Sequence, residues 1–128
     1  MKPIFILWIT VLTFSACKKD KATPVSLTGA YTGKLYSTST GVAQADAKLV
    51  IADKTYNASL NTPFAAGSRG SYVVNDKEIN FTDSLVHTAN FDWGLLLNGK
   101  YTSAIKGDSL ILVKKGAGYS YTYRLKKE

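Results

Sequence analysis

The only histidine of this 128-residue chain, His87, is the natural starting point for acid–base chemistry. Asp83 and Ser84 precede it closely, so a serine–histidine–aspartate catalytic group would have to use these three side chains. No Gly-x-Ser-x-Gly turn surrounds Ser84 to expose it as a nucleophile. A metal site made from His87, Asp83 and Asp92 is a second reading, but one imidazole with scattered carboxylates is a weak set of ligands. We therefore interpret His87 as a residue of a loop over 84–90 and expect no enzyme activity, no metal and no cofactor.

Cys17 is the only cysteine, and it directly follows a segment with the order of a secretory signal. A positively charged start precedes an apolar run at residues 4–14, and the small residues Ser15 and Ala16 follow it. The apolar run is too short for a membrane-spanning helix, which needs about 20 such residues. We therefore predict that residues 1–16 form a signal peptide that is removed.

The sequence Phe14-Ser15-Ala16-Cys17 resembles the lipobox of bacterial lipoproteins, with Phe14 in the place of the usual Leu. In that family the thiol is linked to diacylglycerol before the signal is cut, so the resemblance implies lipidation of Cys17 and a membrane as partner. Two or more acyl chains hold a protein firmly on a bilayer. Lys18, in the second position, resembles lipoproteins sorted to the outer membrane, so we expect the cell envelope, with the periplasmic face favoured. The alternative is an ordinary signal peptide followed by an incidental cysteine.

The segment after the signal is long enough for one domain and carries an excess of positive charge. The 128 residues less the 16 of the signal leave 112, and without Lys2 they keep 15 Lys and Arg against 9 Asp and Glu, a net charge of about +6. Such a charge suits anionic lipid or polysaccharide surroundings. Because the positive residues are spread along the chain, we expect no nucleic acid as partner. With Cys17 lipidated, no thiol remains for a disulfide, and we expect a monomer.

From Leu27 onward, apolar and polar residues alternate, which is the pattern of half-buried β-strands. Asn, Asp and Gly residues typical of tight hairpin turns separate the runs at 52–54, 75–77, 98–99, 107–108 and 116–118. We count seven strands and a further short one at residues 93–97. A meander of this kind leaves two unpaired edges, and closing it into a barrel removes them. The sequence thus predicts an all-β fold, an antiparallel meander of about eight strands closed into a small barrel at residues 27–128, behind a tether at residues 17–26.

The turn and core positions of this segment resemble small lipocalin-like bacterial envelope lipoproteins. The matching positions are Gly70-Ser71-Tyr72, Ile79-x-Phe81, Phe91-Asp92-Trp93, Leu97-Asn98-Gly99-x-Tyr101, Asp108-Ser109-Leu110-x-Leu112 and Tyr121-x-Tyr123-x-Leu125. The resemblance spans residues 27–128 and implies an eight-stranded antiparallel barrel, for most members without an established ligand. The Gly-x-Trp signature of the larger true lipocalins is replaced here by Gly29-Ala30-Tyr31.

Aromatic residues on the predicted core faces are the candidate ligand-binding site. The set is Tyr31, Tyr56, Tyr72, Tyr101, Tyr121, Tyr123 and Trp93. Buried phenols usually need a hydrogen-bond partner, so several of them inside a barrel suit an amphipathic molecule. One hypothesis is therefore a non-enzymatic module that binds a small apolar or amphipathic molecule. The other is a structural, protein-interaction or inhibitor barrel with a filled core, since eight strands enclose little space. In either case the irregular stretches 62–69 and 85–93 are expected to form a mouth or lid.

Overall fold

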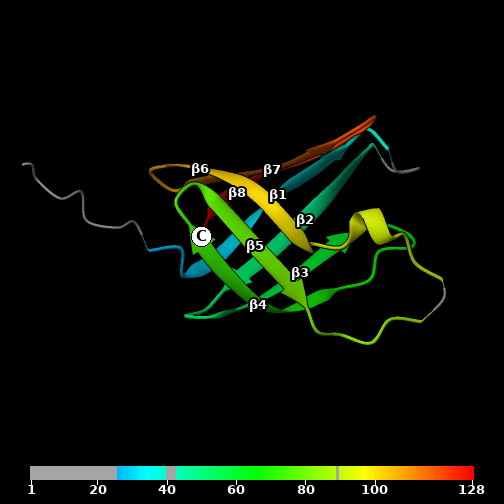
Figure 1. The fold of residues 1–128 in the computed structure, drawn as a ribbon, viewed down its shortest axis with the longest axis horizontal. Coiled ribbons are helices and arrows are strands. Elements are labelled where there is room, and N and C mark those ends of the chain that lie inside the picture. The colour runs from blue at the N-terminus through cyan, green and yellow to red at the C-terminus, as the bar shows by residue number, and fades with distance from the viewer. Residues whose placement is uncertain (1–25, 40–42, 89) are drawn as a thin grey trace, which may run out of the picture.

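Eight antiparallel strands form a closed barrel in the computed structural model, which describes residues 26–39, 43–88 and 90–128 (Figure 1). The predicted signal peptide, Cys17 and most of the tether lie outside the described residues. The strands are β1 (Gly29–Ser37), β2 (Gln44–Ile51), β3 (Thr55–Asn61), β4 (Ser68–Asn75), β5 (Glu78–Asp83), β6 (Gly99–Lys106), β7 (Ser109–Gly116) and β8 (Tyr119–Lys127).

Each strand pairs with the next one along the chain, and β8 pairs with β1 to close the sheet. Leu35 lies opposite Ala45 of β2 on one side and Tyr123 of β8 on the other, so three buried side chains meet at this level of the barrel. The predicted all-β class, meander order and closure are confirmed. No helix among the described residues is long and apolar enough to cross a membrane.

The prediction of a strand at residues 93–97 was wrong. The chain forms a short 3-10 helix there, η1 (Trp93–Leu95), and the Asp92 carboxylate caps it by accepting the amide of Gly94 at 2.8 Å. Leu95, Leu96 and Leu97, here called the leucine plug, are all buried, whereas a strand would turn alternate side chains outward. Eight strands are reached without this segment because the turns at 76–77 and 107–108 each separate two strands.

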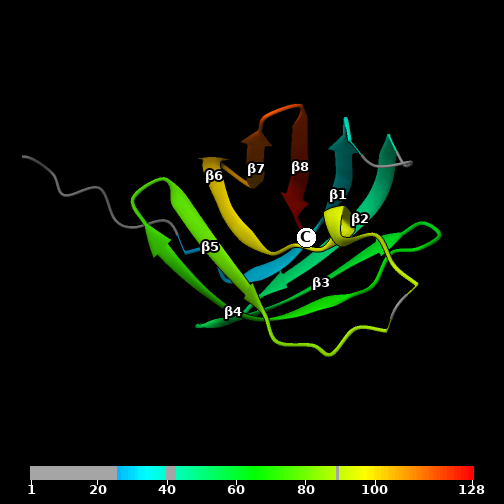
Figure 2. The same ribbon diagram turned by 45° about the vertical axis from the view of Figure 1, so that its right-hand side comes forward.

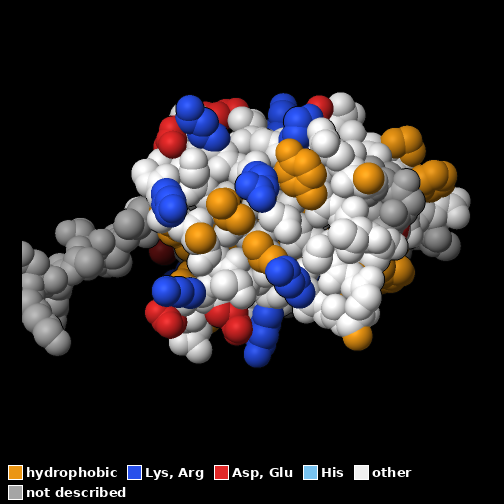
Figure 3. Space-filling model, turned by 90° about the horizontal axis from the view of Figure 1, so that it is seen from above, with side chains coloured by type: hydrophobic (Ala, Val, Ile, Leu, Met, Phe, Trp, Pro, Cys, Tyr) orange, Lys and Arg blue, Asp and Glu red, His pale blue; other side chains and the backbone are white. Residues whose placement is uncertain are grey.

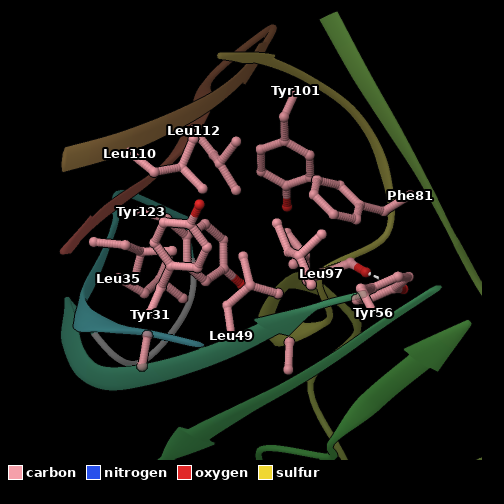
Figure 4. Packing of buried hydrophobic residues seen from close by; sticks show 14 of the residues in the cluster. Tyr31, Leu35, Leu49, Tyr56, Phe81, Leu97, Tyr101, Leu110, Leu112 and Tyr123 are labelled. Carbon is pink, nitrogen blue, oxygen red and sulfur yellow. Dashed lines mark hydrogen bonds between the residues drawn. The ribbon is translucent and has the colours of Figure 1, made fainter. Parts of the chain in front are cut away.

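The inward faces of the strands meet in one hydrophobic core, shown in Figure 4. β2 illustrates the pattern, since Ala45, Ala47, Leu49 and Ile51 are buried while every residue between them is exposed. This alternation is what the sequence predicted for that run.

The barrel has two different ends, which can be followed in Figures 1 and 2. One end, here called the near end, holds both termini of the described chain and the turns at 52–54, 76–77 and 107–108. The opposite end is called the far end. The far end carries the connections 38–43, 62–67, 84–98 and 117–118. Each near-end turn contains an Asp or Lys, whereas the far-end connections contain one charged residue between them, Asp92. The two ends are therefore built for different surroundings.

Candidate functional site

The predicted aromatic site divides between the barrel interior and its surface. Tyr31, Tyr56, Tyr101 and Tyr123 are buried in the core, as their alternation predicted. Tyr72 and Tyr121 are partly buried and pack against that core. Trp93 lies apart from them, with 72% of its surface exposed at the far end.

Four aromatic rings form a continuous row across the interior (Figure 4). The Tyr56 and Phe81 rings are 4.9 Å apart, Phe81 and Tyr101 are 5.9 Å apart, and Tyr101 and Tyr123 are 5.9 Å apart, all edge to face. Such edge-to-face contacts stabilise a core by more than the burial of their apolar area alone would. Phe81 was not among the predicted site residues, although its place in the alternating run of β5 indicated an inward position.

Most of these phenols are hydrogen-bonded to the protein. Tyr56 donates to the carbonyl of Leu97 at 2.6 Å, Tyr31 to that of Leu27 at 2.8 Å and Tyr72 to that of Ala52 at 2.7 Å. The Tyr121 hydroxyl accepts a hydrogen bond from Ser39 at 2.7 Å. The partners are backbone carbonyls and one loop hydroxyl, so these four phenols form hydrogen bonds that stabilise the fold.

Tyr101 and Tyr123 differ, because no described residue forms a hydrogen bond with either hydroxyl. Tyr101 is only 1% exposed and Tyr123 only 3%. This burial raises the pKa of both groups, and neighbouring phenols, Tyr56 among them, raise it further. An acceptor group of a small molecule, or a water, could take a hydrogen bond from these hydroxyls.

The leucine plug fills the interior next to these rings. The Leu97 carbonyl accepts from Tyr56, and the Leu97 amide donates to the buried hydroxyl of Ser68 at 3.2 Å. A void bordered by Leu95, Leu97, Tyr123 and residues of β3 is too small to hold a water molecule. The predicted mouth is thus occupied by the protein's own side chains at this point.

Outside the plug, four apolar side chains project into solvent at the far end. This apolar cap consists of Phe64 (70% exposed), Leu85, Val86 (98% exposed) and Trp93. Its two loops are joined directly, because the Asp92 amide donates to the carbonyl of Phe64 at 2.9 Å. In the view of Figure 3, charged side chains lie over the near end and the middle of the barrel, while the far end shows hydrophobic and uncharged ones. The sequence indicated the two loops, 62–69 and 85–93, but singled out only Trp93.

A buried hydrogen-bonded pair of side chains lies beneath the cap. Asp83, at the end of β5, pairs with Nε2 of His87, and their side chains are only 6% and 8% exposed. The other carboxylate oxygen of Asp83 accepts the amides of Arg69 and Leu85. Burial alone raises the pKa of the Asp83 carboxyl, but these hydrogen bonds outweigh it and the pKa lies below its ordinary value. The His87 ring lies 4.8 Å from that of Phe91, tilted by 44°, so the Asp83–His87 pair packs against the later part of the same loop.

The arrangement around His87 is not that of a serine nucleophile. The Ser84 hydroxyl donates to the Arg69 carbonyl at 2.9 Å, and the imidazole is engaged by Asp83 instead. Asp92 caps η1, and the described residues contain no group of three side chains suited to hold a metal ion.

Three positive side chains stand where strands reach the far end. Arg69 is the second residue of β4, and Lys114 and Lys115 lie near the end of β7. Lys114 donates to the carbonyl of Asn98 at 3.0 Å, beside the leucine plug. Both nearby carboxylates, Asp83 and Asp92, are already engaged within the protein. The uncharged, apolar loops of the far end are thus followed by strand ends that carry positive side chains.

A comparison with protein-family models, with curated proteins and with solved structures gives no match to this chain. Function therefore has to be argued from the site itself.

Proposed function

We propose that this chain is a lipid-anchored envelope protein of the lipocalin-like lipoprotein kind, whose barrel is a rigid, non-enzymatic docking module. It acts through the apolar cap at its far end. The observation that carries the proposal is the contrast between the burial of the leucine plug and the high exposure of Val86 and Trp93 on the same connection. Contiguous exposed apolar side chains in a folded protein commonly mark an interaction site.

The anchor proposed from the sequence fits this use of the molecule. The described chain begins at the near end, so a tether from Cys17 would leave the apolar cap at the opposite end and free to contact a partner. Replacing Cys17 by Ser tests the anchor, and the variant should move from the membrane fraction to the soluble fraction. A Cys17→Ser protein that stays in the membrane fraction would contradict lipid anchoring.

Site-directed photocrosslinking in cells tests the docking surface. A benzophenone amino acid would replace Val86 in the cap or, as a matched control, Val73, which is 67% exposed on the wall of β4. We expect adducts from position 86 and few from position 73, whether the captured molecule is a lipid or a protein. Equal yields at the two positions, or none at 86, would show that the cap is not a docking surface.

A small amphipathic ligand remains a second candidate function, and the hydroxyls of Tyr101 and Tyr123 favour it. Both point into the interior (Figure 4), and no described residue forms a hydrogen bond with either hydroxyl, so an acceptor group of a ligand could complete them. Native mass spectrometry before and after lipid extraction should then detect a bound molecule that the double variant Tyr101→Phe, Tyr123→Phe loses. A protein that carries no molecule in either state excludes this candidate and leaves the docking proposal untouched.

A further inference from the structure

We infer that the partner of the apolar cap is an anionic phospholipid bilayer, into whose interface Phe64, Val86 and Trp93 insert. This inference rests on the docking function proposed above and names the partner class for that surface. Four features of the described residues carry it, and each concerns the far end of the barrel.

The first feature is the lack of charge on the loops that would enter the lipid. The connections 62–67 and 84–98 contain no Lys or Arg, and their one carboxylate, Asp92, is occupied in capping η1. Charged side chains are costly to place among acyl chains, so a loop that inserts must be free of them. The near-end turns, which each carry an Asp or Lys, do not meet this condition.

The second feature is the chemistry of the exposed tips. Val86 is 98% exposed, Trp93 is 72% exposed and Phe64 is 70% exposed. Tryptophan is enriched where a membrane meets water, because its ring is apolar and its N–H polar. The rings of Phe91 and Trp93 lie 4.5 Å apart, and Phe91 in turn contacts His87, which pairs with Asp83.

The third feature is the backbone of Phe64, whose φ is +64°. A bulky residue is disfavoured in this left-handed region, where Gly or Asn would be at ease. The Phe64 ring gains little from the fold in return, because most of it is exposed. Backbone strain of this kind is typical of functional sites, and insertion into lipid is a use that would bury the ring.

The fourth feature is the charge behind the tips. Arg69, Lys114 and Lys115 stand at the far ends of β4 and β7, where they would meet headgroups once the tips are inserted. A tether from Cys17 to Leu27 spans about 30 Å when extended, whereas tilted strands of this length span roughly 25 Å. The cap is thus within reach of the same membrane that holds the anchor.

Vesicle binding of the unlipidated chain starting at Lys18, which keeps every described element, tests the inference. After removal of Trp8 with the signal, Trp93 is the only tryptophan and reports on its own surroundings. Vesicles of phosphatidylcholine and phosphatidylglycerol in equal parts should shift Trp93 emission to the blue, and brominated lipid should quench it. Phosphatidylcholine alone should bind more weakly, because the three basic side chains then lack anionic partners.

Matched variants assign the binding to the cap. Val86→Asp should weaken vesicle binding by about tenfold or more, the change expected for the loss of one inserted aliphatic side chain. Val73→Asp places the same charge on the barrel wall and should leave binding unchanged. Replacing Arg69, Lys114 and Lys115 by Gln should remove the preference for phosphatidylglycerol.

Three results would overturn the bilayer as partner: no spectral shift with either vesicle, equal effects of Val86→Asp and Val73→Asp, or a shift that brominated lipid does not quench. If position 86 nevertheless crosslinks a protein in cells, the docking function stands and only the partner named here is wrong. If neither vesicles nor crosslinking detect contact at the cap, both proposals fail.

Discussion

The carboxylate of Asp83 and the imidazole of His87 form a pair that is almost completely screened from solvent, although His87 belongs to a loop. The pair crosses from the end of β5 to the loop that carries Val86 and leads to Trp93. Because the same carboxylate accepts the amides of Arg69 and Leu85, it ties β4, β5 and the loop together. The first part of the loop that carries Val86 is therefore positioned by this carboxylate.

Asp83→Asn should destabilise the protein at neutral pH by about 1–3 kcal/mol, since it removes the charge from a buried hydrogen-bonded pair. The folded-state pKa of Asp83 lies below its unfolded value of about 3.9, so its contribution is complete above that pH and is lost as pH falls through the folded value. Urea unfolding of both proteins should show the difference shrinking in acid. Asp46→Asn, in the exposed pair with Lys34, is the control and should cost less than about 1 kcal/mol. Equal costs at the two sites would contradict a special role for Asp83.

Phe64→Asn should leave the unfolding free energy unchanged or raise it by up to about 1 kcal/mol, because Asn adopts a positive φ with less strain. The same variant should bind anionic vesicles more weakly. Chemical denaturation and the vesicle assay, run on one preparation, separate the two effects. A loss of more than about 1 kcal/mol would mean that the Phe64 ring supports the fold.

Tyr56→Phe should cost about 1–2 kcal/mol, because the buried Leu97 carbonyl loses its 2.6 Å donor. The matched change Tyr72→Phe removes a similar hydrogen bond, to Ala52, at an exposed position. There water takes the place of the hydroxyl, and we expect a smaller loss of stability. The comparison, made by urea unfolding, would fail if Tyr72→Phe were the more damaging of the two.

High pH should unfold the protein through its buried phenols. Burial raises the pKa of Tyr56, Tyr101 and Tyr123 above the ordinary value of about 10. In the unfolded chain these groups lose their protons near pH 10, while the folded protein keeps them, so stability falls as pH rises further, by up to about 1.4 kcal/mol per pH unit for each phenol. Urea unfolding at about pH 9 and about pH 11 should show this loss, and Tyr101→Phe should reduce its slope. An unchanged slope would mean that Tyr101 ionises alike in both states.

Gly70→Ala should be destabilising by about 1–3 kcal/mol or more, since a methyl group there would lie 1.8 Å from the backbone carbonyl oxygen of Thr82. Gly67 offers a control three residues away, where the nearest atom to an added methyl, the Ala58 carbonyl oxygen, is at an ordinary 3.5 Å. Gly67→Ala should change the unfolding free energy by less than about 1 kcal/mol. Thermal unfolding of the pair measures the difference, and similar melting temperatures would rule out close packing at Gly70.

The sequence predicted the barrel well because its signals are local. Alternation in β2 and the tight turns at 52–54, 75–77, 107–108 and 116–118 depend on neighbours along the chain, and these were confirmed. The run at residues 93–97 misled for the same reason, since three consecutive leucines fit a buried strand as readily as a plug. Two hydrogen bonds distinguish the plug from a strand. The Asp92 side chain accepts the amide of Gly94 at the start of η1, and the Leu97 amide donates to Ser68, which is a tertiary contact. The predicted hairpin turn at 98–99 was wrong, because residues 84–98 form a long connection and Gly99 begins β6.

The candidate site was predicted less completely than the fold. Tyr101 and Tyr123 were placed inside the barrel correctly, but their lack of protein partners depends on distances that no spacing reveals. The short spacing of Asp83 and His87 indicated that the two side chains could lie close together. Their burial under the cap could not be predicted, because it depends on packing against Phe91. Phe64 carried no local signal for its positive φ, because its residue type argues against one.

The register that joins the first strand to the last, with Tyr31 opposite Lys127 and Ser37 opposite Tyr121, has a kinetic consequence. Contacts so distant in sequence give the fold a high contact order, and such folds form slowly. Until β8 arrives, β1 and β7 both present open edges that can pair with other chains. Loss of the last nine residues alone would therefore convert a self-contained molecule into one prone to aggregate, with every residue of the apolar cap still in place.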